Sequence, residues 1–129
     1  MNNLSLGIDV SKETLDVMLL KENKQKARKF KNNQKGFEEL VEWLAKREAK
    51  AAIIGLESTG RYGLPLCKHL YKQGLKVSMI NAAWIKFHGQ ALGARNKTDK
   101  YDAYVIADYC HKNKLELWEP PAPEMEELQ

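Results

Sequence analysis

Four acidic residues occupy positions from which their carboxylates can act together on a metal ion. Asp9 lies near the end of a short apolar run, Glu57 directly follows the run AAIIGL, and Asp99 and Asp102 stand one helical turn apart in NKTDKYDA. Crowded carboxylates raise one another's pKa, and hard divalent cations with oxygen ligands relieve that repulsion. The set therefore predicts a site for Mg²⁺ or Mn²⁺, and two such ions suit in-line phosphodiester chemistry.

Each acid also has an ordinary structural explanation. Asp99 in the first turn of a helix is favoured by the helix dipole without any metal. Asp102 can pair with a neighbouring lysine, and Glu57 and Asp9 can anchor the turns that follow them. The metal interpretation is preferred because all four residues are expected at one edge of one sheet.

The elements that must position these acids are predicted from the periodicity of apolar residues. An amphipathic helix is expected within residues 33–50, where Phe37, Leu40, Val41 and Leu44 share one face. Before it come three strands, two within 4–24 and a polar one within 26–33. After it come a buried strand (51–57), a helix (58–74), a strand (75–80), a partly helical connection (81–97) and a last helix (98–113).

This order predicts an α/β fold with a mixed sheet, in which an antiparallel three-strand meander is followed by βαβ units and helices cover the sheet faces. It matches the ribonuclease H-like architecture. If the first strand is central and parallel to the strand at 51–57, Asp9 and Glu57 become neighbours at the carboxyl edge of the sheet, where α/β proteins place their sites. The first turn of the last helix can then bring Asp99 and Asp102 to them.

The charge of the 129-residue chain is unevenly distributed. The net charge is +4, but residues 115–129 hold five Glu and no Lys or Arg, which leaves 21 basic and 12 acidic residues in positions 1–114. Residues 1–114 therefore carry a net charge of +9. This charge favours a polyanionic partner such as nucleic acid, although a merely soluble, Lys-rich surface is the simpler explanation. No apolar run approaches the roughly 20 residues of a membrane helix. The first residues lack the basic-then-apolar layout of a signal peptide, so Cys67 and Cys110 are expected to be reduced thiols in a cytoplasm. Their spacing fits no closed zinc site, and both are expected on core faces of helices.

Three blocks of the sequence resemble one family. GIDVSKETLDV, GLESTGRYG and ARNKTDKYDAYVIADY, in this order and over nearly the whole chain, resemble the amino-terminal RuvC-like domain of DEDD transposases of the insertion-sequence-110 family, which are related to Piv-type DNA invertases. The resemblance implies that Asp9, Glu57, Asp99 and Asp102 are the D, E, D and D metal ligands and catalytic residues of that family.

The resemblance also implies partners and a domain organisation. It implies Mg²⁺-dependent cutting and rejoining of DNA, a bridging guide RNA, homo-oligomers of the full-length protein, and a nucleoid-associated place in a bacterial or archaeal cytoplasm. Residues 1–114 are expected to be the catalytic domain, and 115–129 an acidic, Pro-containing linker with the start of a truncated helix. The family has a second domain with a Ser proposed as nucleophile, so the isolated fragment is not assumed to be competent for recombination.

Residues beside the acids are candidates for nucleic-acid contacts. Lys97 is the best candidate for a phosphate contact, although it can equally pair with the carboxylates, and Arg95 lies in the same loop. Arg61 and Tyr62 can meet a nucleic-acid backbone. Thr59 can contact a phosphate or simply cap the next helix.

Two further stretches have both a structural and a functional interpretation. Trp84 and Phe87 can stack on unpaired bases or belong to the core. The basic run at positions 24–31 can bind RNA or DNA, or protect an edge strand from aggregation.

The preferred function is the catalytic domain of an RNA-guided DNA transposase or recombinase. The alternative is a non-catalytic nucleic-acid-binding or assembly module on the same fold. Half of an actin-like ATPase or sugar kinase is disfavoured, because no Gly-rich phosphate turn follows Asp9.

Overall fold

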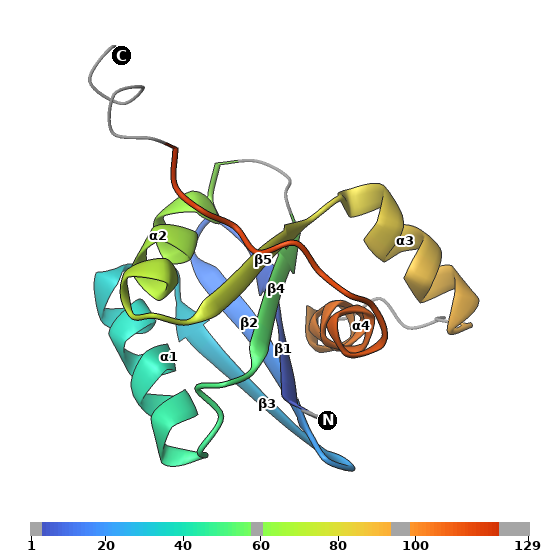
Figure 1. The fold of residues 1–129 in the computed structure, drawn as a ribbon, viewed down its shortest axis with the longest axis horizontal. Helices are drawn as coiled ribbons and strands as arrows, with labels where there is room; N and C mark the ends of the chain where they lie inside the picture. The colour runs from blue at the N-terminus through green and yellow to red at the C-terminus, as the bar shows by residue number, and fades with distance from the viewer. Residues whose placement is uncertain (1–3, 58–60, 94–98, 122–129) are drawn as a thin grey trace.

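A five-stranded mixed sheet runs through the centre of the chain (Figure 1). The computed structural model describes residues 4–57, 61–93 and 99–121, apart from the side chains of Asp99 and Lys100. The strand order is β3-β2-β1-β4-β5. Strands β1, β2 and β3 form an antiparallel meander, whereas β1, β4 and β5 are parallel. The strands are β1 Leu4–Val10, β2 Thr14–Lys21, β3 Lys24–Lys31, β4 Ile53–Glu57 and β5 Lys76–Ile80.

Helices cover both faces of this sheet. Helices α1 (Gln34–Lys46) and α2 (Leu64–Lys72) lie on one face, and α4 (Asp99–Lys112) lies on the other, with α3 (Ala82–Ala91) packed against α4 (Figure 1). The predicted mixed sheet with a meander followed by βαβ units is confirmed. The connection at 81–97, expected to be only partly helical, contains one regular helix, α3.

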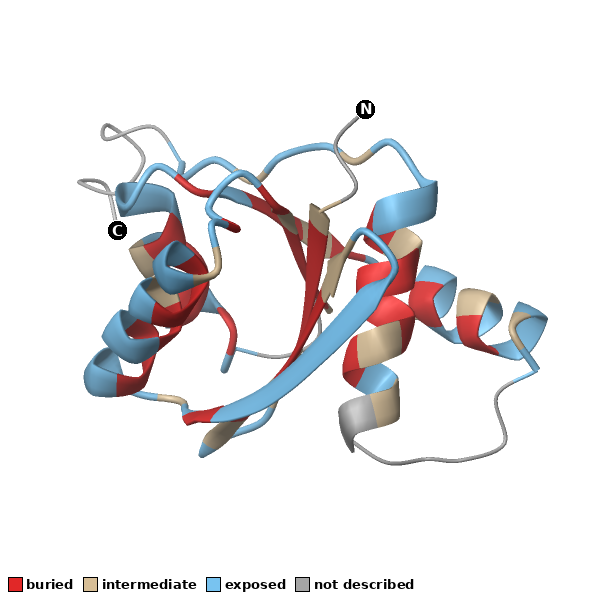
Figure 2. Cartoon of the chain, turned by 90° about the horizontal axis from the view of Figure 1, so that it is seen from below, coloured by how far each residue is buried: buried red, intermediate tan, exposed pale blue. Residues whose placement is uncertain are grey.

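The larger core lies between the sheet and helices α1 and α2. Leu6 and Ile8 of β1 are fully buried there, together with Ile54 and Leu56 of β4. Each buried aliphatic side chain contributes about 1.5–3 kcal/mol relative to exposure. The predicted apolar face of α1 is confirmed, because three of its four residues are buried and Val41 packs half-buried against them. Figure 2 shows this burial concentrated on the sheet and on the inner sides of the helices, with β3 exposed.

Local signals set the ends of the helices. The Asn33 carboxamide oxygen accepts a hydrogen bond from the Gly36 amide at 2.8 Å and caps α1. Pro65 stands in the first turn of α2, where a missing N–H costs nothing. Beyond α2, Gly74 takes the left-handed conformation (φ 79°), as expected for a residue that ends a helix.

The segment after α4 packs along β5. The Trp118 amide donates to the Val77 carbonyl at 2.7 Å, and the Ser78 hydroxyl donates to the Glu116 carbonyl at 2.8 Å. The Trp118 ring meets Tyr71 edge-on. The boundary expected at residue 114 stays a prediction, and ordered packing continues to Trp118. The helix start expected near the end of the chain lies outside the described residues.

Within the described residues, no helix combines the length and apolarity that crossing a membrane requires.

Candidate metal and nucleic-acid site

Strand alternation places the predicted acids on the sheet face that α4 covers. In β1, Leu6 and Ile8 point to the core with α1 and α2, so Gly7 and Asp9 point to the opposite face. In β4 the same alternation puts Glu57 on the α4 side. The last residues paired between β1 and β4 are Ile8 and Leu56, so Asp9 and Glu57 follow on adjacent strands about 4.8 Å apart.

Two glycines let α4 lie close to the sheet. Gly7 and Gly55 are paired across β1 and β4. A Cβ at Gly7 would collide with the Ala103 carbonyl oxygen and the Ala107 amide nitrogen of α4, whereas a Cβ at Gly55 would meet the Cys110 sulfur. The Ser5 hydroxyl adds a hydrogen bond to the Ala107 carbonyl at 2.9 Å. This close contact fixes α4 over the strands that carry Asp9 and Glu57.

Glu57 and Asp102 face one cavity. It has a volume of about 320 Å³ and is lined by residues from the end of β4, from α3 and from α4, including Lys86 and Tyr101. Partial burial raises the pKa of Glu57, and the negative charge of Asp102 raises it further. Two carboxylates that disfavour each other's ionised form fit a divalent cation, whose charge removes the repulsion.

The structure describes three of the four predicted ligand side chains, those of Asp9, Glu57 and Asp102. Glu57 and Asp102 share the cavity, and Asp9 lies on the adjacent strand on the same sheet face. The Asp99 backbone begins α4, one turn before Asp102, and its side chain lies outside the described residues. Among the side chains that the structure describes, no three His, Cys, Asp or Glu are grouped tightly enough to hold a metal ion.

A further acid, Asp16, lies beside Asp9 at this edge of the sheet, and it is not among the four acids predicted from the sequence. Asp16 is the direct cross-strand partner of Asp9 on the α4 face, and it forms an ion pair with Lys29 at 3.6 Å. Like charges directly opposite each other on a sheet repel and are destabilising. Asp9 and Asp16 together therefore add to the negative potential at this edge. Alternation in the two predicted strands could have identified Asp16 once their register was known.

A buried ionic cluster holds α3 against α4. Asp108 is only 6% exposed and accepts hydrogen bonds from His88 at 2.8 Å and Lys112 at 2.9 Å. Burial favours a higher pKa for Asp108, but the hydrogen bonds and charges of Lys112 and His88 outweigh it and lower the pKa. The cluster matters for the site because α3 supplies one wall of the cavity.

Comparison with known proteins identifies the family. A family model of DEDD transposases of the insertion-sequence-110 type, described as "Transposase", matches residues 6–129. The chain belongs to this family. Over 122 residues it is 35% identical to the pilin gene-inverting proteins of Moraxella bovis and Moraxella lacunata, which covers 93% of this chain and 38% of each relative. The chain thus spans well under half the length of these relatives.

The fold of this transposase-family chain is that of RuvC, a ribonuclease H-like fold. A RuvC from T. thermophilus, solved in complex with a Holliday junction substrate, matches with a TM-score of 0.61 and 13% identity, over 89% of this chain and 99% of RuvC. A second structure of Thermus thermophilus RuvC matches with a TM-score of 0.57 and 14% identity, over the same shares of both chains. The predicted fold class and family are both confirmed.

The predicted nucleic-acid contacts fall partly within the described residues. Arg61 and Tyr62 are exposed, with the guanidinium 6.0 Å from the ring centre. Thr59, Arg95 and Lys97 lie outside the described residues.

The structure shows whether the two aromatic residues of α3, Trp84 and Phe87, belong to the core. Trp84 is 58% and Phe87 is 64% exposed, so the interpretation of these two side chains as core is wrong. They lie at the outer side of α3, which packs against α4 through Ile85 instead. Exposure keeps them available for base stacking.

Both cysteines are free thiols in the core. Cys67 packs between α2 and the sheet, and Cys110 packs between α4 and β4. Burial raises the pKa of each thiol to about 12, so neither is a thiolate near neutral pH.

Proposed function

We propose that this chain is the metal-dependent catalytic domain of a DNA transposase or recombinase that cleaves and transfers DNA strands. The observation that carries the proposal is the cavity shared by Glu57 and Asp102, with Asp9 beside it at the sheet edge. The chain's membership of the DEDD transposase family supports the same chemistry. The RuvC structural neighbour bound to a Holliday junction supports branched or duplex DNA as the substrate.

Four carboxylates would hold Mg²⁺ or Mn²⁺: those of Asp9, Glu57, Asp99 and Asp102. When bound, such ions activate the attacking oxygen and stabilise the leaving oxygen of a phosphodiester. The chain itself supplies the rigid placement of the ligands. Strands β1 and β4 carry Asp9 and Glu57 at adjacent positions, and the glycine contacts hold α4, which carries Asp102, close to these strands.

Residues around the acids would hold the nucleic-acid backbone. This role is proposed for Lys97, Arg61, Tyr62, Thr59 and Arg95. The net charge of +9 over residues 1–114 favours such a partner. The full-length protein would act in a cytoplasm at the nucleoid, as a homo-oligomer directed by a bridging guide RNA.

The first test is calorimetric titration of the chain with Mn²⁺, alone and after Asp102→Ala. The parent is expected to bind Mn²⁺, and the variant is expected to bind at least about tenfold more weakly, because the site loses a charged ligand. Glu39→Gln, which neutralises an exposed acid on α1, is the matched control and should bind like the parent. A folded parent that binds no Mn²⁺, with or without a DNA duplex, would contradict the proposed site.

The alternative function is a non-catalytic nucleic-acid-binding module. It is favoured if DNA binding by the chain is unchanged by Mn²⁺ and by Asp102→Ala. The shared cavity of Glu57 and Asp102 is the observation against it, because a purely binding surface has no use for two carboxylates facing a polyanion.

A further inference from the structure

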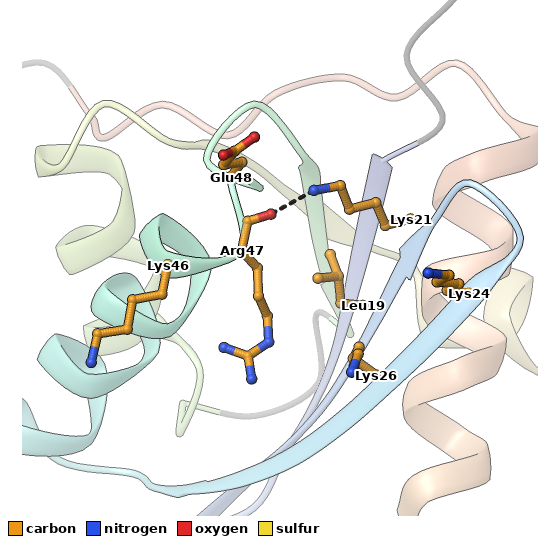
Figure 3. A pocket seen from close by; sticks show the side chains of 7 residues that line it. All are labelled: Leu19, Lys21, Lys24, Lys26, Lys46, Arg47 and Glu48. Atoms are coloured by element: carbon orange, nitrogen blue, oxygen red, sulfur yellow. Dashed lines mark hydrogen bonds between the residues drawn. The ribbon is translucent and has the colours of Figure 1, made fainter.

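A second cavity, strongly basic, lies away from the acids. It has a volume of about 330 Å³, and Figure 3 shows the side chains that line it. Five are cationic and come from two parts of the fold, the β2–β3 hairpin and the carboxyl end of α1. We call this cavity the basic cleft, and its cations are Lys21, Lys24, Lys26, Lys46 and Arg47.

The basic cleft and the acids lie on opposite faces of the sheet. Leu19, at the base of the cleft, belongs to the core beneath α1, whereas Asp9 and Glu57 point to the α4 side. They also lie at opposite ends of the strands. Lys21 pairs with Leu4 and Asp16 pairs with Asp9, five residues further along, which corresponds to about 17 Å. One phosphate group cannot occupy both sites.

Two of the cations are held in place by the protein. The Lys21 ammonium donates to the Arg47 carbonyl at 2.7 Å, which ties the hairpin to the end of α1 (Figure 3). The Arg47 guanidinium lies 4.5 Å from the centre of the Trp43 ring and donates to the Trp43 carbonyl at 3.3 Å. Such anchoring lowers the entropy lost when an anion binds.

The remaining cations add charge with little local compensation. Lys24 and Lys26 alternate with Gln25 along the exposed edge strand, so both project to the α1 face. Lys46 is paired with Glu42 at 3.0 Å, but both side chains are mostly exposed, so the pair is weak. Glu48 is the one carboxylate among the residues that line the cleft.

Folding alone does not explain this concentration of charge. Lysines on an edge strand prevent aggregation, but that role is served equally by Lys29 and Lys31 on the other face of β3. The carbonyls at the end of α1 attract a cation, which accounts for one neighbour and not for five. Like charges gathered in one recess repel one another, so their convergence indicates an anionic ligand.

We propose that the basic cleft binds the phosphodiester backbone of a nucleic acid, at a point separate from the backbone held at the acids. This inference rests on the proposed function only in that the partner is a nucleic acid. A strand seated in the cleft on one face and a strand at the acids on the other would be held apart by the sheet. The cleft therefore serves a second nucleic-acid segment, whether a guide RNA or flanking DNA.

The test is fluorescence polarisation with labelled single-stranded RNA, single-stranded DNA and duplex DNA of equal length, in EDTA so that no cleavage occurs. The variant Lys24→Ala/Lys26→Ala is compared with Lys68→Ala/Lys72→Ala, which removes the same charge from the exposed side of α2. Each lost phosphate contact lowers the slope of log K against log salt by about 0.7 for a single strand or 0.9 for a duplex. For the cleft variant, which loses two lysines, the slope should therefore fall by about 1.4 with a single strand or about 1.8 with a duplex. For the control variant, the slope should be unchanged.

A gain-of-affinity variant gives an independent readout. Glu48→Gln removes the negative charge from the cleft lining and keeps the shape of the side chain, so it should bind the same probe more tightly than the parent. Circular dichroism checks that each variant is folded. The probe that loses most affinity in the lysine variant identifies RNA or DNA as the ligand.

Some outcomes would contradict nucleic-acid binding by the basic cleft and leave the proposed metal site unaffected. Equal losses in the two lysine variants, an unchanged salt slope, or a folded parent that binds none of the three probes would each contradict the inference. Mn²⁺ binding should be unchanged in Lys24→Ala/Lys26→Ala, and nucleic-acid binding in EDTA should survive Asp102→Ala. The metal site and the cleft can therefore fail separately.

Discussion

At the scale of single residues, the most informative feature of the site is the raised pKa of Glu57. Glu57 ends a strand whose other side chains are apolar, so it is partly desolvated, and Asp102 adds a like charge from α4. Both effects penalise ionisation and raise the pKa of Glu57. In the metal-free domain this stored repulsion is a cost of folding, and a bound cation would relieve it.

Asp102→Asn should lower the pKa of Glu57 toward its ordinary value of 4.5 without reaching it, because desolvation, the larger cause, remains. Since the folded pKa lies above the unfolded one, the stability contributed by Glu57 is complete below the unfolded pKa and is lost as the pH rises through the folded pKa. The variant should lose less stability over that interval. Carboxyl ¹³C NMR titration and thermal melts across the same pH range measure both effects.

The opposite pH dependence of Asp108 must be separated from this signal. The pKa of Asp108 is lowered, so its contribution is present above the unfolded pKa and is lost as the pH falls through the folded one. The difference between Asp102→Asn and the parent cancels it, since both keep Asp108. An unchanged Glu57 titration in the variant would mean that the two carboxylates do not interact.

At the scale of elements, the site depends on how closely α4 approaches β1 and β4. Small residues make that approach, with Gly7 and Gly55 on the strands and Ala103 and Ala107 on the helix. The atoms that crowd Gly7 belong to the α4 backbone, whereas those at Gly55 belong to side chains. A backbone cannot move locally, but a side chain can change its rotamer.

Gly7→Ala should therefore lower the free energy of unfolding by about 3 kcal/mol or more, and Gly55→Ala by about 1 kcal/mol. Urea unfolding of the two variants measures the difference. Adding Cys110→Ala should offset part of the cost at Gly55, because it removes the sulfur that the new methyl group meets. It should not rescue Gly7→Ala. Equal costs at the two positions would contradict the proposed backbone contact.

At the scale of the whole molecule, the sheet separates two surfaces with different chemistry. The α4 face carries the acids and the cavity bordered by α3. The α1 face carries the basic cleft at the far end of the strands. On the outer side of α3, Trp84 and Phe87 line a shallow groove together with His88, Tyr109 and Asn113. That groove lies between α3 and the carboxyl-terminal half of α4, and its Trp84 and Phe87 rings are exposed.

Trp84→Ala/Phe87→Ala should weaken binding of single-stranded nucleic acid by about 1–3 kcal/mol per stacked base while leaving the salt slope unchanged, because stacking releases no counterions. Stability should change little, since both rings are exposed. Leu117→Ala, at another exposed apolar residue, is the control. Polarisation measurements over a series of salt concentrations separate this effect from that of the lysines. A changed slope with unchanged affinity would contradict stacking.

The sequence by itself determined the order of the elements and the strand ends that carry acids. Helical and strand periodicities are local, so the spacing of apolar residues from Phe37 to Leu44 predicted α1. In the same way, Glu57 was identified as an acid at the end of an apolar strand. The family blocks then fixed the identity of the chain. None of these inferences needed knowledge of which strands pair.

Only the tertiary structure decided which side chains meet. The pairing of Asp9 with Asp16 depends on strand register, and the contacts of His88 with Asp108 and of Lys21 with Arg47 join segments 20 and 26 residues apart. The exposure of Trp84 depends on which side of α3 packs against α4. Register and packing are set by the sum of many long-range contacts, and no local pattern of residues encodes that sum.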